Sequence, residues 1–194
     1  MCSWCWGFSQ ALEDLIGKLP LDVNLQYVMG GLAPDSDEPM PEEIQGYVQN
    51  AWRQVSATTG ARFNFDFWEK CQPRRSTYPA CRAALAAGLQ GKLAQMFGAL
   101  QRAYYMEARN PSDASTHLAL AGELGLDVVQ FGEDLVSARV EELLQMDFEL
   151  GREFGVRGFP TLVLSTEKGD HPIVSGWSTL EAVWNRIERI LASE

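Results

Sequence analysis

The sequence predicts an α/β fold in which a long helical block interrupts a smaller frame of strands and helices. The chain begins with a helix and a strand, and it ends with two strands and a helix. Between these ends, residues 41–150 show helical periodicity almost throughout. Because the strands at both ends need to share a sheet, we expect residues 1–40 and 151–194 to form the frame. Residues 41–150 then form an inserted helical subdomain.

The frame opens with an amphipathic helix. Its apolar residues recur at spacings of three and four, which is typical of one helix face, and Pro20 ends the segment. These apolar residues are Phe8, Leu12, Leu15, Ile16 and Leu19. Residues 21–29 then alternate between apolar and polar side chains before Gly30-Gly31. This period of two predicts a strand with one face partly open to solvent.

The helical block contains several segments that turn signals separate. We expect helices near residues 41–52, 77–90 and 91–107. Asn110-Pro111-Ser112 breaks the chain before a further helix, which Gly125 ends. Asp127 is a candidate cap for the next helix. That helix has an apolar face of Phe131, Leu135, Val140 and Leu143.

The C-terminal part of the frame is predicted as strand, turn, strand and helix. Residues 161–164 form a short continuous apolar run, which suits an interior strand. A turn at 168–170 precedes a second strand at Ile173 and Val174. Residues 178–181 have the pattern of a capping box, which opens the last helix. The apolar face of that helix is Leu180, Val183, Trp184, Ile187 and Leu191.

Composition and charge limit the classes of partner. The chain has 194 residues, with 16 basic and 26 acidic side chains and a formal charge of -10. Phosphate groups and anionic membranes both attract clustered Lys and Arg, so we expect neither nucleic acid nor a membrane as partner. The first residues lack the basic start and apolar run of a secretory signal. The simplest location is therefore the cytoplasm.

The spacing of the cysteines indicates which reactions the protein can perform. Of four cysteines, Cys2 and Cys5 form a C-x-x-C motif, while Cys71 and Cys81 lie further along the chain. A zinc site needs two more ligands at suitable spacing, which neither the second pair nor the two distant histidines supply. Two buried structural thiols are another reading of the motif. The helix that follows favours a third reading, a redox-active dithiol at a helix N-terminus.

The helix N-terminus predicts different roles for the two thiols. Unpaired backbone N–H groups and the helix dipole place partial positive charge near Cys2, which favours its thiolate. A lowered pKa would make Cys2 the attacking nucleophile. Cys5, one turn further on, would be the resolving thiol that attacks the mixed disulfide and releases the partner. Trp4 and Trp6 are either core residues or part of an apolar rim that receives unfolded chains.

Pro160 is the second feature with chemical content. It lies in Gly155-Val-Arg-Gly-Phe-Pro-Thr161, directly before the predicted strand. Proline cannot donate to a sheet ladder, so the first position of the strand suits it. Most X–Pro bonds in folded proteins are trans. The position of this proline raises the expectation of a cis bond well above that base rate.

These features together resemble the DsbA family, and most closely its FrnE-like branch of protein-disulfide isomerases. The resemblance rests on the N-terminal MCSWCWGF, on Gly158-Phe-Pro-Thr161, on the helical insertion and on the segment RSTYPACR at 75–82. It implies a thioredoxin-like fold in which Cys2 and Cys5 match the active-site disulfide. It also implies that Pro160 matches a cis-proline facing them, beside backbone that pairs with an extended substrate peptide. Phe159 would supply that backbone, so Phe159 and Pro160 are candidate substrate-binding residues, together with Trp4 and Trp6.

The sequence departs from the family in two places. Ser-Trp stands between the cysteines, where the strongly oxidising members have Pro-His. With no imidazole there to stabilise the thiolate, we predict a potential less oxidising than the roughly -120 mV of such an oxidant. The family also has a strand directly before its C-x-x-C, between those expected at 21–29 and 161–166. We expect this first strand to be missing, because the chain is trimmed, because its start was set at an internal Met, or because another element fills the gap.

The sequence therefore predicts a thiol–disulfide oxidoreductase acting on protein or peptide cysteines, with an isomerase as the narrower alternative. No metal or organic cofactor is expected, and electrons would come from another thiol system such as glutathione. The rivals are a glutathione-dependent transferase or isomerase of the same fold, and a redox-inactive binding module or fragment. For Cys71 and Cys81, a second disulfide, a regulatory switch and two buried thiols stay open, and a reducing cytoplasm favours buried thiols.

Overall fold

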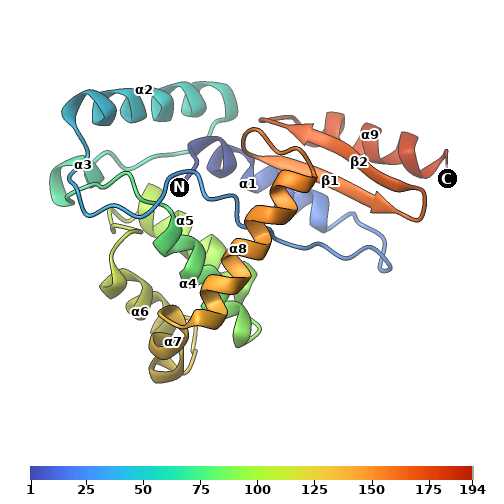
Figure 1. Ribbon diagram of the computed structural model, residues 1–194. Helices are drawn as coiled ribbons and strands as arrows, with labels where there is room; N and C mark the ends of the chain where they lie inside the picture. The colour runs from blue at the N-terminus through green and yellow to red at the C-terminus, as the bar shows by residue number, and fades with distance from the viewer. Residues whose placement is uncertain (194) are drawn as a thin grey trace.

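The computed structural model describes residues 1–193, which form a two-stranded sheet at one end of the molecule and a group of helices at the other (Figure 1). The helices are α1 (Ser3–Ile16), α2 (Glu42–Thr59), α3 (Phe67–Lys70), α4 (Tyr78–Leu89), α5 (Leu93–Tyr105), α6 (Ala114–Glu123), α7 (Val128–Leu135), α8 (Ala138–Glu153) and α9 (Leu180–Leu191). The strands are β1 (Thr161–Thr166) and β2 (Gly169–Ser175). The predicted α/β class is confirmed. The division at residues 40 and 150 stays a prediction.

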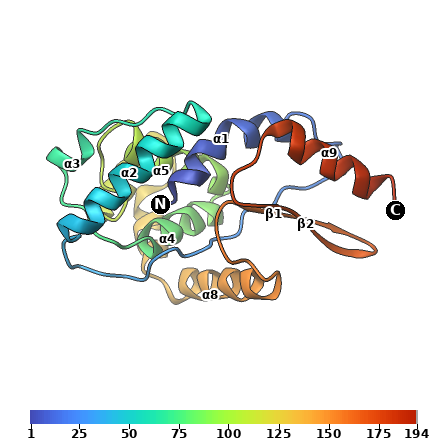
Figure 2. The same cartoon turned by 90° about the horizontal axis from the view of Figure 1, so that it is seen from above.

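The hairpin of β1 and β2 organises the frame. Its strands run antiparallel, with Thr161 opposite Ser175 and Thr166 opposite Gly169. In Figure 2, α1 and α9 lie on one side of the hairpin and α8 on the other. The apolar faces predicted for the first and last helices meet the hairpin in one core, as amphipathic helices on a sheet should, except that Ile16 and Leu191 near the helix ends are exposed. The buried members of this core are Phe8, Leu15, Ile173, Val174, Val183 and Ile187.

The strand predicted at residues 21–29 is wrong. This segment pairs with no other strand in the described part of the chain. Its alternation is only partly expressed, because Met29 is buried while Leu21 and Leu25 are exposed. The physical reason is the lack of a neighbour, since a strand needs partners for its backbone N–H and C=O groups. The N–H of Met29 instead donates to Oδ2 of Asp147 in α8, at 2.8 Å.

The interior position predicted for β1 is also not found. Within residues 1–193, β1 pairs with β2 alone, and its other edge faces the segment that contains residues 25–32. The strand that would lie between them in the family has no counterpart among the described residues. This edge is therefore open, and it forms one wall of the groove described below.

Two helix starts differ from the sequence prediction. Thr179, and not Ser178, is the N-cap of α9, and its hydroxyl accepts from the N–H of Ala182 at 3.3 Å. Asp127 caps α7 as predicted, but the single helix expected after it is two helices. The break occurs because Ser137 begins a new cap, with its hydroxyl accepting from the N–H of Val140 at 3.2 Å.

The helical part contains two further cores. Helices α5 to α8 pack around the alanine-rich α4, whose small side chains let the neighbouring helices approach closely. A separate aromatic cluster surrounds the fully buried Trp52 of α2. This cluster includes Phe63, Phe65, Phe67, Trp68, Tyr104 and Tyr105. In residues 1–193, no helix combines the length and the apolar character that crossing a membrane requires.

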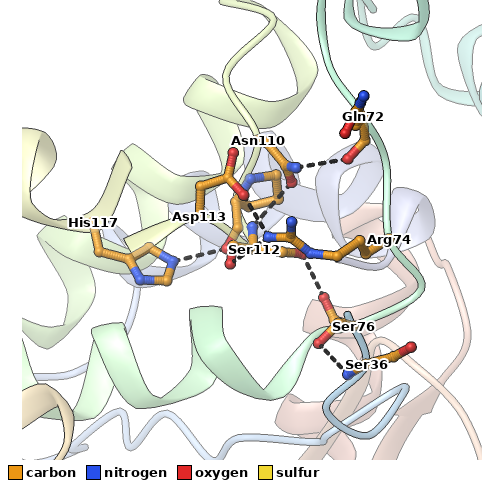
Figure 3. A network of polar contacts seen from close by, with 9 residues as sticks. Ser36, Gln72, Arg74, Ser76, Asn110, Ser112, Asp113 and His117 are labelled. Carbon is orange, nitrogen blue, oxygen red and sulfur yellow. Dashed lines mark hydrogen bonds and ion pairs between the residues drawn. The ribbon is translucent and has the colours of Figure 1, made fainter. Parts of the chain in front are cut away.

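A network of polar contacts holds the loops between these cores (Figure 3). Arg74 forms an ion pair with Asp113, and the hydroxyl of Ser112 donates to the carbonyl of Ser76 at 2.8 Å. The hydroxyl of Ser76 in turn accepts from the N–H of Ser36 at 3.2 Å. Part of this network borders a cavity of about 240 Å³. Because these groups already bind one another, we assign the network a structural role.

Candidate active site

Cys2 and Cys5 lie together at the start of α1. Cys2 is the N-cap residue, with an extended backbone, and Cys5 lies in the first turn. All four cysteines are free thiols. The Sγ of Cys2 lies 3.7 Å from the backbone carbonyl oxygen of Phe159, to which the protonated thiol donates, although the two residues are 157 positions apart in the sequence. The fold thus brings the C-x-x-C motif against the loop that contains Pro160.

The surroundings shift the pKa values of the two thiols in opposite directions. The pKa of Cys2 is lowered to about 6, chiefly because the thiol of Cys5 donates a hydrogen bond to its thiolate. Burial opposes this shift, whereas the backbone N–H groups of Cys5 and Trp4 assist it and the terminal amine adds least. The same hydrogen bond to Cys2, together with burial, raises the pKa of Cys5 well above its ordinary value. One thiol is thereby ionised near neutral pH while the other keeps its proton.

The helix N-terminus acts as the sequence indicates. The backbone N–H groups of Trp4 and Cys5 at this N-terminus favour the thiolate of Cys2, although Cys2 makes no capping hydrogen bond through its thiol. The hydrogen bond from Cys5 outweighs them. This second contribution was not part of the sequence reasoning, because it depends on the relative positions of two side chains.

The loop before β1 faces the cysteines. The peptide bond between Phe159 and Pro160 is cis, and Pro160 is buried. The carbonyl of Pro160 is occupied, because it accepts from the N–H of Gly176 at 2.8 Å. The ring of Phe159 lies directly on Gly30, where an added Cβ would be 2.2 Å from a ring carbon. The cis-proline loop therefore contacts both the cysteine helix and the segment that ends at Gly30.

A largely apolar groove of about 220 Å³ lies beside the cysteines. Cys2, Cys5, Phe159 and Pro160 all line it. One wall is the segment 25–32, and the other is formed by Phe159 and the start of β1. Further lining residues come from α1, α4 and α5: Phe8, Ser9, Leu12, Ala80, Cys81, Ala84, Phe97, Leu100 and Gln101.

Two candidate substrate-binding residues lie elsewhere. Neither Trp4 nor Trp6 lines this groove. Trp6 packs into the aromatic cluster, where its ring stacks on Tyr105 with centroids 5.5 Å apart. Its indole Nε1 donates to the carbonyl of Arg62 at 2.9 Å. For Trp6, the structure thus matches the core alternative of the sequence analysis.

The second pair of cysteines is separated by the fold. Cys71 packs against the aromatic cluster, and its Sγ donates to the carbonyl of Ala108 at 3.1 Å. Cys81 packs against the helical core and lines the groove, and burial raises its pKa. Sequence reasoning missed this position of Cys81. Across residues 1–193, no group of three or more His, Cys, Asp or Glu side chains could hold a metal ion.

This arrangement suits thiol–disulfide exchange. An ionised Cys2 can attack a disulfide sulfur, and a nearby protonated Cys5 can supply the second thiol. The open edge of β1 and the segment 25–32 offer backbone on both sides of the groove to an extended chain. Apolar lining between these walls favours apolar side chains of such a chain.

Comparisons with known proteins give relatives along almost the whole chain. The family described as a DSBA-like thioredoxin domain matches residues 1–188. A candidate protein disulfide isomerase from Nitrosomonas europaea, known from its crystal structure, is 27% identical. It superposes with a TM-score of 0.89, over 100% of this chain and 94% of that chain.

Two other relatives are more distant or longer. The cytosolic disulfide reductase DsbM from Pseudomonas aeruginosa is 24% identical, with a TM-score of 0.81 over 100% of this chain and 96% of that chain. At this identity the likeness shows the fold alone. The ClpXP adapter protein SpxH of Bacillus subtilis is 28% identical over 166 residues, which are 84% of this chain and 54% of SpxH. The chain thus spans about half the length of the curated relatives it matches.

The family match agrees with the architecture of the chain. A helix with an N-terminal C-x-x-C, a cis-proline before a strand, and a hairpin followed by a helix occur here in the family's order. The helices between them account for the mostly helical content of the fold. With a match that extends over residues 1–188, this chain belongs to the DSBA-like thioredoxin domain family.

Proposed function

We propose that the protein is a thiol–disulfide oxidoreductase that acts on cysteines of proteins or peptides. The observation that carries the proposal is the pair of opposite pKa shifts at Cys2 and Cys5, beside a groove bounded by the cis-proline loop. Membership of a family with oxidoreductase members supports it. Cys2 is the nucleophile, Cys5 the resolving thiol, and Phe159 with Pro160 shapes the substrate site.

The reaction needs two exchange steps. The thiolate of Cys2 attacks one sulfur of a substrate disulfide, which forms a mixed disulfide and releases the first substrate thiolate. Cys5 then loses its proton to solvent or to that thiolate, and its sulfur attacks the sulfur of Cys2. The second substrate thiol leaves, the substrate has gained two electrons, and Cys2–Cys5 is a disulfide. The reverse sequence oxidises a substrate dithiol.

The electron donor or acceptor is another thiol system, and glutathione fits this role. DsbM, which shares the fold, was crystallised with GSH. DsbM is also described as cytosolic, which supports a cytoplasmic location for this protein. Disulfide isomerase activity is the narrower form of the proposal, and the name of the Nitrosomonas relative supports it.

Insulin reduction by dithiothreitol and refolding of scrambled ribonuclease test the proposal. Wild-type protein should accelerate at least one of these reactions, and Cys2→Ser should abolish the acceleration. Cys71→Ser is the matched control, because Cys71 lies in the aromatic cluster and does not line the groove. Rates with wild-type protein that equal those with Cys2→Ser would refute the proposed activity.

A protein-binding role is the second candidate, because the SpxH relatives are named as ClpXP adapters. Such a role would use the groove without thiol exchange. It predicts that Cys2→Ser still binds the partner protein with unchanged affinity. A glutathione-dependent transferase is the third candidate, and its chemistry should survive Cys5→Ser, because no resolving thiol takes part in it.

A further inference from the structure

Gln101 is an unusual residue of the groove. It lies in α5 and is only 3% exposed, yet it lines the groove beside the cysteines. Its side-chain amide has two N–H donors and a carbonyl acceptor. None of these forms a hydrogen bond within the described part of the chain. Its amide atoms are not among the fully enclosed polar atoms that lack a partner, so the small exposed part of this side chain leaves the amide within reach of a molecule in the groove.

The small hydroxyl side chains of the groove differ in this respect, and Gln26, which also lines the groove, is exposed to solvent. The hydroxyl of Ser9 donates to the carbonyl of Trp6 at 2.8 Å, and that of Thr77 donates to the carbonyl of Ala33 at 3.0 Å. The hydroxyl of Thr161 donates to the carbonyl of Gly158 at 2.8 Å. These groups use their hydrogen bonds within the fold. Gln101 has its full capacity left for a molecule in the groove.

Other buried polar atoms without partners lie outside the groove. They are the indole nitrogens of Trp52 and Trp68 and the hydroxyl of Tyr105, all in the aromatic cluster. These atoms are inaccessible to solvent and their residues do not line the groove, whereas Gln101 borders a groove large enough for part of a peptide. Gln101 is therefore the buried group whose missing partner a ligand can supply.

We propose that Gln101 binds a peptide group of the thiol substrate while the substrate cysteine reacts with Cys2. A carboxamide matches a peptide group, because each offers one N–H donor and one C=O acceptor to the other. The surrounding walls are mostly apolar, which suits a peptide better than a highly charged ligand. This assignment rests on the proposed function, and it adds the chemical class that the groove recognises.

Single-turnover oxidation of the reduced protein tests the assignment without a second enzyme. Reduced protein is mixed with excess disulfide, and Trp fluorescence follows the formation of the Cys2–Cys5 disulfide. Three disulfides are compared: glutathione disulfide, the disulfide of a short cysteine peptide with blocked ends, and bis(2-hydroxyethyl) disulfide, which contains no amide. Gln101→Leu removes the amide at similar volume, and Gln101→Met is a second such variant. Gln54→Leu, on the exposed surface of α2, is the matched control.

We expect Gln101→Leu to lower the second-order rate constant for a peptide-containing disulfide about three- to tenfold, as the loss of a hydrogen bond would. The rate with bis(2-hydroxyethyl) disulfide should change less than about twofold. A loss confined to glutathione disulfide would assign Gln101 to the tripeptide, and a loss with both peptide substrates to peptide chains in general. The melting temperature should not fall, because the side chain has no partner inside the fold.

Three results would overturn the assignment. If the rate constant falls equally with all three disulfides, or falls with none of them, the Gln101 amide does not recognise peptide groups. A clear fall in melting temperature for both Gln101→Leu and Gln101→Met would assign Gln101 a structural role. If wild-type protein is oxidised by none of the disulfides, the proposed function is itself wrong and the assignment falls with it.

Discussion

Removal of the Cys5 thiol tests the origin of the low pKa of Cys2. The hydrogen bond from Cys5 is the largest of the causes that lower this pKa to about 6. A hydrogen bond to a charged group contributes about 1.5–3 kcal/mol, and one pKa unit corresponds to about 1.4 kcal/mol. Cys5→Ala should therefore raise the pKa of Cys2 by roughly one to two units. Cys5→Ser keeps a hydroxyl donor in the same place, so it should leave the pKa close to that of wild-type protein.

The pH dependence of alkylation measures this pKa. Iodoacetamide reacts with the thiolate, so the rate for the peptide that contains Cys2 gives its titration curve between about pH 5 and about pH 9. The midpoint should lie near 6 in Cys5→Ser and near roughly 7–8 in Cys5→Ala. The midpoint is a better measure than the rate at one pH, because thiolates of higher pKa are intrinsically more nucleophilic. Cys71 and Cys81 are internal references, since burial raises both pKa values.

Two outcomes would refute this reasoning. Identical midpoints in Cys5→Ala and Cys5→Ser would show that Cys5 donates no hydrogen bond that matters, which leaves the helix N-terminus as the cause. A midpoint for wild-type protein near that of free cysteine, roughly 8.5, would contradict the lowered pKa itself. The proposal of Cys2 as nucleophile would then lose its electrostatic basis.

Three further predictions concern the redox pair, the groove and the core. The midpoint potential of the Cys2–Cys5 pair is measured by Trp fluorescence in glutathione buffers. It should fall by about 59 mV per pH unit below the pKa of Cys2, where reduction takes up two protons, and by about 30 mV per pH unit above that pKa, where it takes up one. A single slope with no change near about pH 6 would contradict this prediction. Gly30→Ala should displace the Phe159 ring and slow reduction of a peptide disulfide roughly tenfold, whereas Gly46→Ala, with no atom near the added Cβ, should not. Leu144→Ala, at a fully buried position, should lower the free energy of unfolding in urea by about 2–5 kcal/mol, while Leu118→Ala at a 38% exposed position should cost about 0.5 kcal/mol or less.

Two residues of the groove, Gln101 and Cys81, were not predicted from the sequence. Gln101 lies on the buried side of α5, among Met96, Leu100 and Tyr104. A polar residue on such an apolar face is a signal that could have identified it. Cys81 had a weaker signal, since it lies in a segment that resembles the family but has no distinctive spacing to Cys2 or Cys5. Neither residue could be placed in the groove before the packing of α4 and α5 beside α1 was known.

Local patterns in the sequence by themselves determined most of the helices, the hairpin and the position of Cys2 at a helix N-terminus, but not the short α3 or the break between α7 and α8. Periodicity, capping residues and prolines act over a few neighbouring residues, so their effect on secondary structure can be predicted from the local sequence. Residues 21–29 show the opposite case, because alternation predicts a strand only if a partner strand is present. Tertiary structure alone decided that this partner is absent among the described residues, that Cys5 adjusts the pKa of Cys2, and that a groove separates residues 25–32 from β1. These features depend on contacts between segments far apart in the chain, and no local pattern encodes such contacts.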